Sequence, residues 1–282
     1  VGRRPAGSVY RADGFIGVPA IIDIDGDGQV EVITGNRIHK FNLSYLGNDG
    51  DVGDHTQNTY TTIEGPASVT LPVNSSGTTT KTYYLCDGFT RVADIDGDGE
   101  LDIIVMNNLS DGYDDIDALI YVWDPNSQEI KAANSFYSNG DYGQFGIPFI
   151  GDINGRLDGR DITRGTFNKR LPEICITAGR ISRNRVNDRR GRSGFQFHPE
   201  SDMSNQRFES DYNQIIALTY DGGEPDIADR LKISWALEHY DYSNNTGITM
   251  FDFNNDGAFD LCYRDQDYLR VISPKLGPTD YI

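Results

Sequence analysis

The sequence predicts an all-β protein built from short strands and many turns. Glycine is frequent, with 31 residues among 282, and 16 tyrosines and 13 phenylalanines accompany short runs of β-branched residues. Outside 225–232 and the segment around 236, apolar residues do not recur at helical spacing. Short apolar runs bounded by turn residues are typical of strands. The 37% hydrophobic content is enough for a buried core in one large or two ordinary domains.

The charge of the chain excludes several classes of partner. There are 43 acidic and 25 basic residues, a formal net charge of −18, which disfavours general binding to nucleic acid or to an anionic membrane. No apolar run approaches the roughly 18 residues that cross a bilayer. The given sequence starts at Val1 without the charged-then-apolar pattern of a signal segment. We therefore expect a soluble chain with no membrane insertion, consistent with a mature or excised piece.

One sequence pattern occurs four times: an aromatic or glycine lead-in, two or three apolar residues, an acidic glycine-rich loop and a strand of about five residues. A second strand-like run follows each copy, at 38–43, 119–123, 215–220 and 268–272. The predicted unit is strand, acidic loop, strand, turn, strand, which makes a small antiparallel sheet. The copies lie at about 14–46, 86–125, 144–221 and 245–274 of a single region spanning residues 1–282.

The spacing of oxygen-bearing residues in the loops predicts calcium sites. Positions 1, 3 and 5 carry carboxylates or amides, a peptide carbonyl near position 7 adds a ligand, and a carboxylate at position 9 closes the loop; Ca²⁺ prefers such hard oxygen ligands. Glycines such as Gly26 and Gly28 permit the positive φ of a tight curl. Crowded carboxylates are costly without a cation or bound protons. The predicted ligands of three ions are Asp23, Asp25, Asp27, Gln29 and Glu31; Asp94, Asp96, Asp98, Glu100 and Asp102; and Asp252, Asn254, Asp256, Ala258 and Asp260.

The third copy is interrupted. Asp152 and Asn154 occupy positions 1 and 3, Arg156 stands at position 5, and the motif resumes only at Glu173. A carboxylate from within the insertion, Asp158 or Asp161, would have to replace the missing ligand. A fourth calcium ion is expected only if it does.

A plain turn, a magnesium site and an EF-hand each fit the loops less well than a calcium site. A single acidic glycine-rich stretch is often just a solvated turn, but three intact copies in the same unit disfavour that interpretation. Mg²⁺ prefers octahedral sites that keep several waters. EF-hand loops have twelve residues, end in a bidentate Glu and are flanked by helices, whereas here the ninth residue closes the loop and a strand follows. A dockerin module fails for the same reason.

The lead-ins Gly17–Pro19 and Gly146–Pro148, with Asp-Ile-Asp-Gly-Asp-Gly and a closing acid, resemble the FG-GAP/VCBS repeat. This is the calcium-bearing blade repeat of integrin α-subunit propellers and many bacterial surface proteins, and 263–272 resembles blades of large secreted bacterial members. The resemblance covers 14–274, with gaps at 47–80 and 180–212. It implies a β-propeller of four-stranded blades with calcium in the loop joining the first two strands of each.

The chain departs from that family in spacing and number. Successive loops start 71, 58 and 100 residues apart, and four are visible where the family usually closes a ring with seven. At about 60 residues per blade a closed ring needs more chain, so we expect a partial ring or fragment. We also expect extra strands within 47–80.

A basic insertion interrupts the acidic body. Residues 156–192 hold 11 Lys or Arg and 4 Asp or Glu. This insertion overlaps a long loop at 177–213. Two interpretations of the basic insertion stay open: it is a solvated segment or one folded back on the acidic body, or it is a ligand-binding loop, since long insertions on rigid scaffolds often carry recognition.

Catalysis has little support in the sequence. The four histidines, His39, His55, His198 and His239, stand in unrelated contexts, and no hydrolase or metalloprotease motif occurs. The enzymatic alternative is a rhamnogalacturonan-type polysaccharide lyase, which is similar in using a calcium-bearing propeller. It would need an open calcium position and a neighbouring base, and the loops look fully supplied with protein ligands.

The favoured function is a non-catalytic, calcium-stabilised recognition or adhesion module that binds protein or glycan through exposed loops. Millimolar calcium exists outside cells, so secretion or surface display is expected. Three cysteines make no disulfide framework, and Cys175 and Cys262 lie in apolar runs, which predicts buried thiols.

Overall fold

The computed structural model describes residues 17–42, 59–72, 80–110, 116–137, 146–155, 159–161, 166–178, 213–239, 247–264 and 268–274. The described residues form strands and turns and contain no helix, so the all-β prediction is confirmed. In consequence no described helix is long and apolar enough to cross a membrane. Most of the insertion at 177–213 and of the basic run lies outside the described residues.

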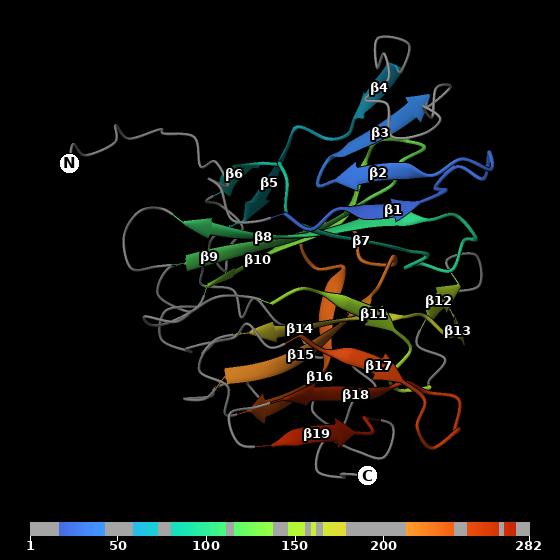
Figure 1. Cartoon of the computed structure of the whole chain (residues 1–282). Helices are drawn as coiled ribbons and strands as arrows, with labels where there is room; N and C mark the ends of the chain where they lie inside the picture. Colours follow the sequence, from blue (N-terminus) through green and yellow to red (C-terminus); the bar gives the residue numbers. More distant parts are fainter. Residues whose placement is uncertain are drawn as a thin grey trace.

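The strands form four main antiparallel sheets, one for each sequence repeat. The first sheet has the order β1 (Ala20–Ile22), β2 (Glu31–Thr34), β3 (Arg37–Asn42), β4 (Thr59–Glu64). The second contains β7 (Phe89–Ala93), β8 (Asp102–Ser110), β9 (Ile116–Trp123), β10 (Ile130–Tyr137). The third contains β11 (Phe149–Gly151), β14 (Glu173–Ala178), β15 (Asn213–Tyr220), β16 (Leu231–His239). The fourth contains β17 (Thr249–Phe251), β18 (Asp260–Arg264), β19 (Leu269–Ile272). Figure 1 shows the sheets stacked in chain order, from blue to red.

Two hairpins stand apart from these sheets. β5 (Ser68–Pro72) pairs with β6 (Thr80–Tyr84) between the first and second repeats. β4 and β5 lie within 47–80, which confirms the expectation of extra strands there. Val69, Leu71 and Tyr83 of this hairpin are buried in the core between the first two sheets. β12 (Gly159–Asp161) pairs with β13 (Thr166–Lys169) inside the interrupted third loop.

The first strands of consecutive repeats are neighbours. β7 contacts both β1 and β11, and β11 contacts β17. Backbone bonds join the first two sheets, from Val18 N–H to the Gly88 carbonyl (3.2 Å) and from Thr90 N–H to the Val18 carbonyl (2.9 Å). Arg91 Nε donates to the Pro148 carbonyl at 3.0 Å and so connects the second sheet to the third. The loops that follow these strands therefore gather along one side of the stack.

Each inner sheet lies between two other sheets and is buried on both faces. Successive side chains of a strand point to opposite faces, so neighbouring residues pack into different cores. In β8, Ile103 packs toward the first sheet and Ile104 toward the third. In β14, Ile174 packs toward the second sheet and Cys175 toward the fourth. This explains why β8, β9, β14 and β15 each contain a continuous apolar run although their sheets are antiparallel.

The two end sheets each keep one open face. Ile21 in the first sheet is 67% exposed and Leu269 in the fourth is 73% exposed. Cys175 is buried as predicted, but the prediction of a buried Cys262 is wrong, because Cys262 is half-buried on the outer side of the last sheet. A face that is covered in an inner sheet is thus open at the end of the stack.

Candidate metal centre

All four acidic loops occupy the same place in their sheets. Each begins directly after the first strand and ends on the first residue of the second strand. The closing residue is paired across the sheet with the residue that precedes the loop, as Ile22 with Glu31, Ala93 with Asp102, Gly151 with Glu173, and Phe251 with Asp260. Glu173 therefore holds the closing position of the third loop despite the insertion before it.

The closing carboxylate is buried in every loop and accepts a backbone hydrogen bond. Its partner is always the N–H of the second loop residue, at 3.0 Å for Ile24 to Glu31, 3.2 Å for Ile95 to Asp102, 2.9 Å for Ile153 to Glu173, and 2.8 Å for Phe253 to Asp260. All four carboxylate residues are at most 1% exposed. Burying a carboxylate is costly unless the group is hydrogen-bonded or paired with a cation. The backbone bond engages one oxygen of each carboxylate, so it offsets only part of the cost of burial.

The first carboxylate of each intact loop holds the curl from inside. Its Oδ2 accepts from the N–H of the sixth residue at 2.9, 3.0 and 2.9 Å in the pairs Asp23 and Gly28, Asp94 and Gly99, and Asp252 and Gly257. These glycines have φ of 87°, 95° and 86°, as predicted. In the fourth loop Asn255 takes the other left-handed position with φ of 57°, which Asn tolerates better than most residues.

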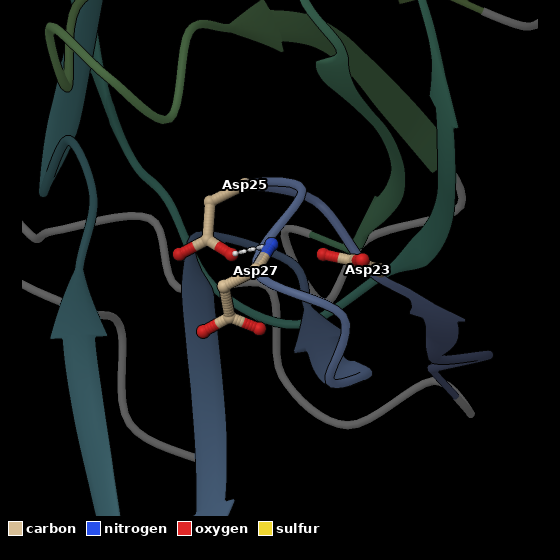
Figure 2. A group of neighbouring side chains, drawn as sticks. All are labelled: Asp23, Asp25 and Asp27. Carbon is tan, nitrogen blue, oxygen red and sulfur yellow. Dashed lines mark hydrogen bonds between the residues drawn. The ribbon is translucent and has the colours of Figure 1, made fainter.

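Two of the loops bring carboxylates together closely enough to hold a metal ion. Oxygens of Asp23, Asp25 and Asp27 lie within 4.8 Å of one another, as do those of Asp94, Asp96 and Asp102. Figure 2 shows the first group arranged around the curl of its loop, with Asp25 accepting a hydrogen bond from the Asp27 backbone.

The remaining predicted ligands are placed less closely. Among the described residues, the carboxylates of the third and fourth loops form no such group. Glu31, Asp98 and Asp256 lie in their loops but outside the two clusters. The roles of the carbonyls of Gln29, Glu100 and Ala258 and of the amide of Asn254 stay predictions.

Sequence reasoning missed two lysines that reach the intact clusters. Lys40, on β3, hydrogen-bonds Asp25 and lies 3.9 Å from Asp27. This hydrogen bond lowers the pKa of Asp25 below its ordinary value. Lys131, on β10, contacts Asp96, Asp98 and Asp102. No local motif identifies these lysines, because each comes from a strand outside its loop.

The second loop is the most strongly perturbed electrostatically. Burial raises the pKa of Asp102 to about 7, although Lys131 opposes the shift. Burial alone would lower the pKa of Lys131, but its hydrogen bonds to Asp102 and Asp96 raise that pKa above the ordinary value. A site in which a carboxylate resists ionisation at neutral pH is one that benefits from additional positive charge.

The third loop is closed by its own side chains. Asn154 hydrogen-bonds Glu173, and Gly155 N–H donates to Asp152 Oδ1 at 2.7 Å. Arg156 and Asp158 lie outside the described residues, and the Asp161 side chain is not described, so the expected replacement ligand stays a prediction. The Phe259 N–H also donates to the Asp152 carbonyl at 2.7 Å, which connects the third and fourth loops.

A basic side chain of the third repeat reaches the fourth loop. Arg170 Nη1 donates to the Gly257 carbonyl at 3.4 Å. On β3, the two ring nitrogens of His39 form hydrogen bonds with the hydroxyl groups of Thr34 and Thr62. His39 is therefore a hydrogen-bonded residue of β3.

Comparisons with known proteins identify no family for the chain. No family model matches it, and no curated protein matches it. Among solved structures it is similar to the crystal structure of the V. cholerae biofilm matrix protein Bap1, with 11% identity and a TM-score of 0.33. The similarity covers 92% of this chain and 60% of that one. At this TM-score the likeness carries no argument about fold or function.

Proposed function

We propose that the chain is a non-catalytic, calcium-binding module for extracellular recognition or adhesion, built from FG-GAP/VCBS-type propeller blades in a partial ring. One observation carries the proposal: four loops share the same register, the same closing carboxylate and the same backbone bond to it. A turn that only reverses the chain does not require a buried carboxylate at its end.

The donor set fits calcium. The loops offer carboxylate, amide and carbonyl oxygens and no sulfur or imidazole, which is the ligand chemistry of a hard cation. Buried oxygens Oδ1 of Asp23 and Oδ1 of Asp260 have no hydrogen-bond donor within the described structure. When bound, a divalent ion would neutralise these groups and join the first two strands of a sheet.

The arrangement of the sheets supports the propeller part of the proposal. Propeller blades are small four-stranded sheets arranged around a central channel. Here β1, β7, β11 and β17 are neighbours in chain order, and each inner sheet buries both faces against the sheets before and after it. The open faces of the first and fourth sheets are consistent with a partial ring.

Exposed aromatic residues beside the fourth loop support a recognition role. Phe251 and Phe253 are 61% and 51% exposed, and their rings meet edge to face at 5.2 Å. Phe259, at the end of the same loop, is 40% exposed. Exposed aromatic clusters are typical of binding surfaces rather than of inert surface, and protein or glycan is the proposed ligand class.

The proposal places the protein where calcium is plentiful. Loop sites of this kind fill at the millimolar calcium found outside cells, so we propose secretion or surface display. The test is isothermal titration of the metal-free chain with CaCl₂, together with thermal unfolding in EGTA and in calcium. Binding with a higher Tm in calcium supports the proposal, and an unchanged Tm with no binding heat refutes it.

A further inference from the structure

The second loop already contains a cation supplied by the protein. Lys131 Nζ lies 2.8 Å from Asp96 Oδ2, 3.2 Å from Asp98 Oδ2 and 2.7 Å from Asp102 Oδ1. These are the third, fifth and ninth positions of the loop. The Lys131 side chain is 15% exposed, so its ammonium lies among the carboxylates rather than in solvent.

The fold positions this lysine from outside the loop. The register of β10 against β9 shifts between Ile130 and Ala132, which places a bulge at Lys131. A bulge redirects a side chain out of the regular alternation. The Lys131 carbonyl also accepts a hydrogen bond from Arg230 Nη1 at 2.8 Å, and this bond holds the bulge from the turn between β15 and β16.

Lys40 in the first loop provides a contrast. It occupies a regular position in β3, opposite Thr61, and its side chain is 31% exposed. It contacts Asp25 and Asp27, but no ion pair joins it to the closing residue, Glu31, within the described structure. Lys40 is therefore at the rim of its loop, whereas Lys131 also pairs with the buried closing carboxylate.

We propose that Lys131 is an exchangeable counter-cation of the second loop, and that its ammonium and a divalent metal ion compete for Asp96 and Asp102. This inference rests on the proposed calcium-binding function. Asp96 and Asp102 belong both to the Lys131 ion pairs and to the cluster that can hold a metal. Two cations that share oxygens a few ångströms apart repel each other strongly at a partly buried site.

Two consequences follow for this loop. Without metal, the second loop keeps its shape because Lys131 neutralises part of its charge. With metal, calcium must displace Lys131, so the second loop binds calcium more weakly than its carboxylate count suggests. The chain then responds to calcium in a graded way, with one repeat protected when the ion is scarce.

The test uses the whole chain and the variant Lys131→Met, which keeps the length of the side chain and removes its charge. Calcium titration calorimetry of wild type and variant gives the affinity of the second loop, assigned as the site lost in Asp94→Asn. We expect Lys131→Met to tighten that site by about tenfold, the effect of removing one competing buried charge. Lys40→Met is the matched control, and a smaller change is expected in its loop.

The calcium dependence of the Tm supplies a second readout, because the loss of a merely structural lysine would lower the Tm equally with and without calcium. In EGTA we expect Lys131→Met to unfold at a lower temperature than wild type, and in saturating calcium the difference closes. If Lys131→Met binds calcium with the wild-type affinity and loses the same Tm in EGTA and in calcium, the proposed role of Lys131 is overturned. Calcium binding by the wild type would still support the proposed function in that case. If neither protein binds calcium, both proposals are overturned.

Discussion

Replacing Asp260 by asparagine separates the two roles of the carboxylate that closes the fourth loop. Its Oδ2 accepts the Phe253 N–H at 2.8 Å, whereas Oδ1 is buried without a donor among the described residues. Asparagine can keep the acceptor for Phe253, but it removes the charge that a cation would neutralise. Asp260→Asn therefore spares the backbone contact and weakens the metal site.

The expected magnitude follows from ligand linkage. A ligand at one hundred times its Kd stabilises the folded state by about 2.7 kcal/mol. In a chain of this size each kcal/mol corresponds to about 2–4 °C in Tm, so losing one site lowers the Tm in calcium by about 5–10 °C. In EGTA the variant no longer buries an unpaired carboxylate oxygen, and we expect its Tm to equal or exceed that of wild type.

The assay is thermal unfolding, followed by circular dichroism, in EGTA and in excess calcium. Asp260→Ala serves as the control, because it also leaves the Phe253 N–H without its partner. An unmade buried hydrogen bond costs about 1–3 kcal/mol, so Asp260→Ala is expected to be less stable in both buffers. If Asp260→Asn lowers the Tm equally in EGTA and in calcium, Asp260 is only a backbone cap and the reasoning is refuted.

Three further predictions concern the core, one turn and pH. Ile120→Ala, in the core between the second and third sheets, should lower the free energy of unfolding by about 2–5 kcal/mol in urea titrations, and a loss under about 1 kcal/mol would contradict that core. Gly35→Ala should lower the free energy of unfolding by about 2–5 kcal/mol, because Gly35 has φ of 58° and a Cβ there would overlap the Cys86 carbonyl oxygen. The control Gly26→Ala, at φ of 72° with open space around the new Cβ, should lower it by about 1–2 kcal/mol. Equal losses in the two variants would refute the contact assigned to Gly35. In EGTA the free energy of unfolding of the wild type relative to Asp102→Asn should fall as the pH rises from the ordinary Asp102 value of 3.8 to about 7, because the folded wild type holds a proton there that the unfolded chain has lost. The slope is at most about 1.4 kcal/mol per pH unit. Urea titrations of both proteins across this range check it, and a difference that rises with pH would contradict the raised pKa of Asp102.

The strand class and the loop positions were predictable because both are local. The oxygen-bearing residues at alternate loop positions and the strand after the ninth residue lie within one short segment. Glu173 was also assigned from the resumption of the motif, and its pairing opposite Gly151 agrees with that assignment. The fourth strands β4, β10 and β16 carry no loop motif, and only the resemblance to four-stranded blades implied them.

The lysines of the loops were missed because they depend on contacts distant in sequence. Lys131 is 35 residues from Asp96, and it reaches the loop only because β10 bulges and Arg230 holds that bulge. Lys40 is 15 residues from Asp25 on a different strand. Local spacing specifies which oxygens can gather in a loop. The positive charges come from lysines that strand pairing brings to the loop, and a linear motif does not encode that pairing.

The composition of a strand reflects the place of its sheet in the stack. The residue after each closing acid, Val32, Ile103, Ile174 or Leu261, faces the preceding sheet where one exists. Only Val32 has no preceding sheet among the described residues, and it is half-buried whereas the other three are fully buried. The residue one position further on faces the following sheet. Cys262, in the last sheet, has no following sheet among the described residues, and it is half-buried. The sequence repeat thus encodes the direction of stacking as well as the loop, since the same two positions always face the preceding and the following sheet.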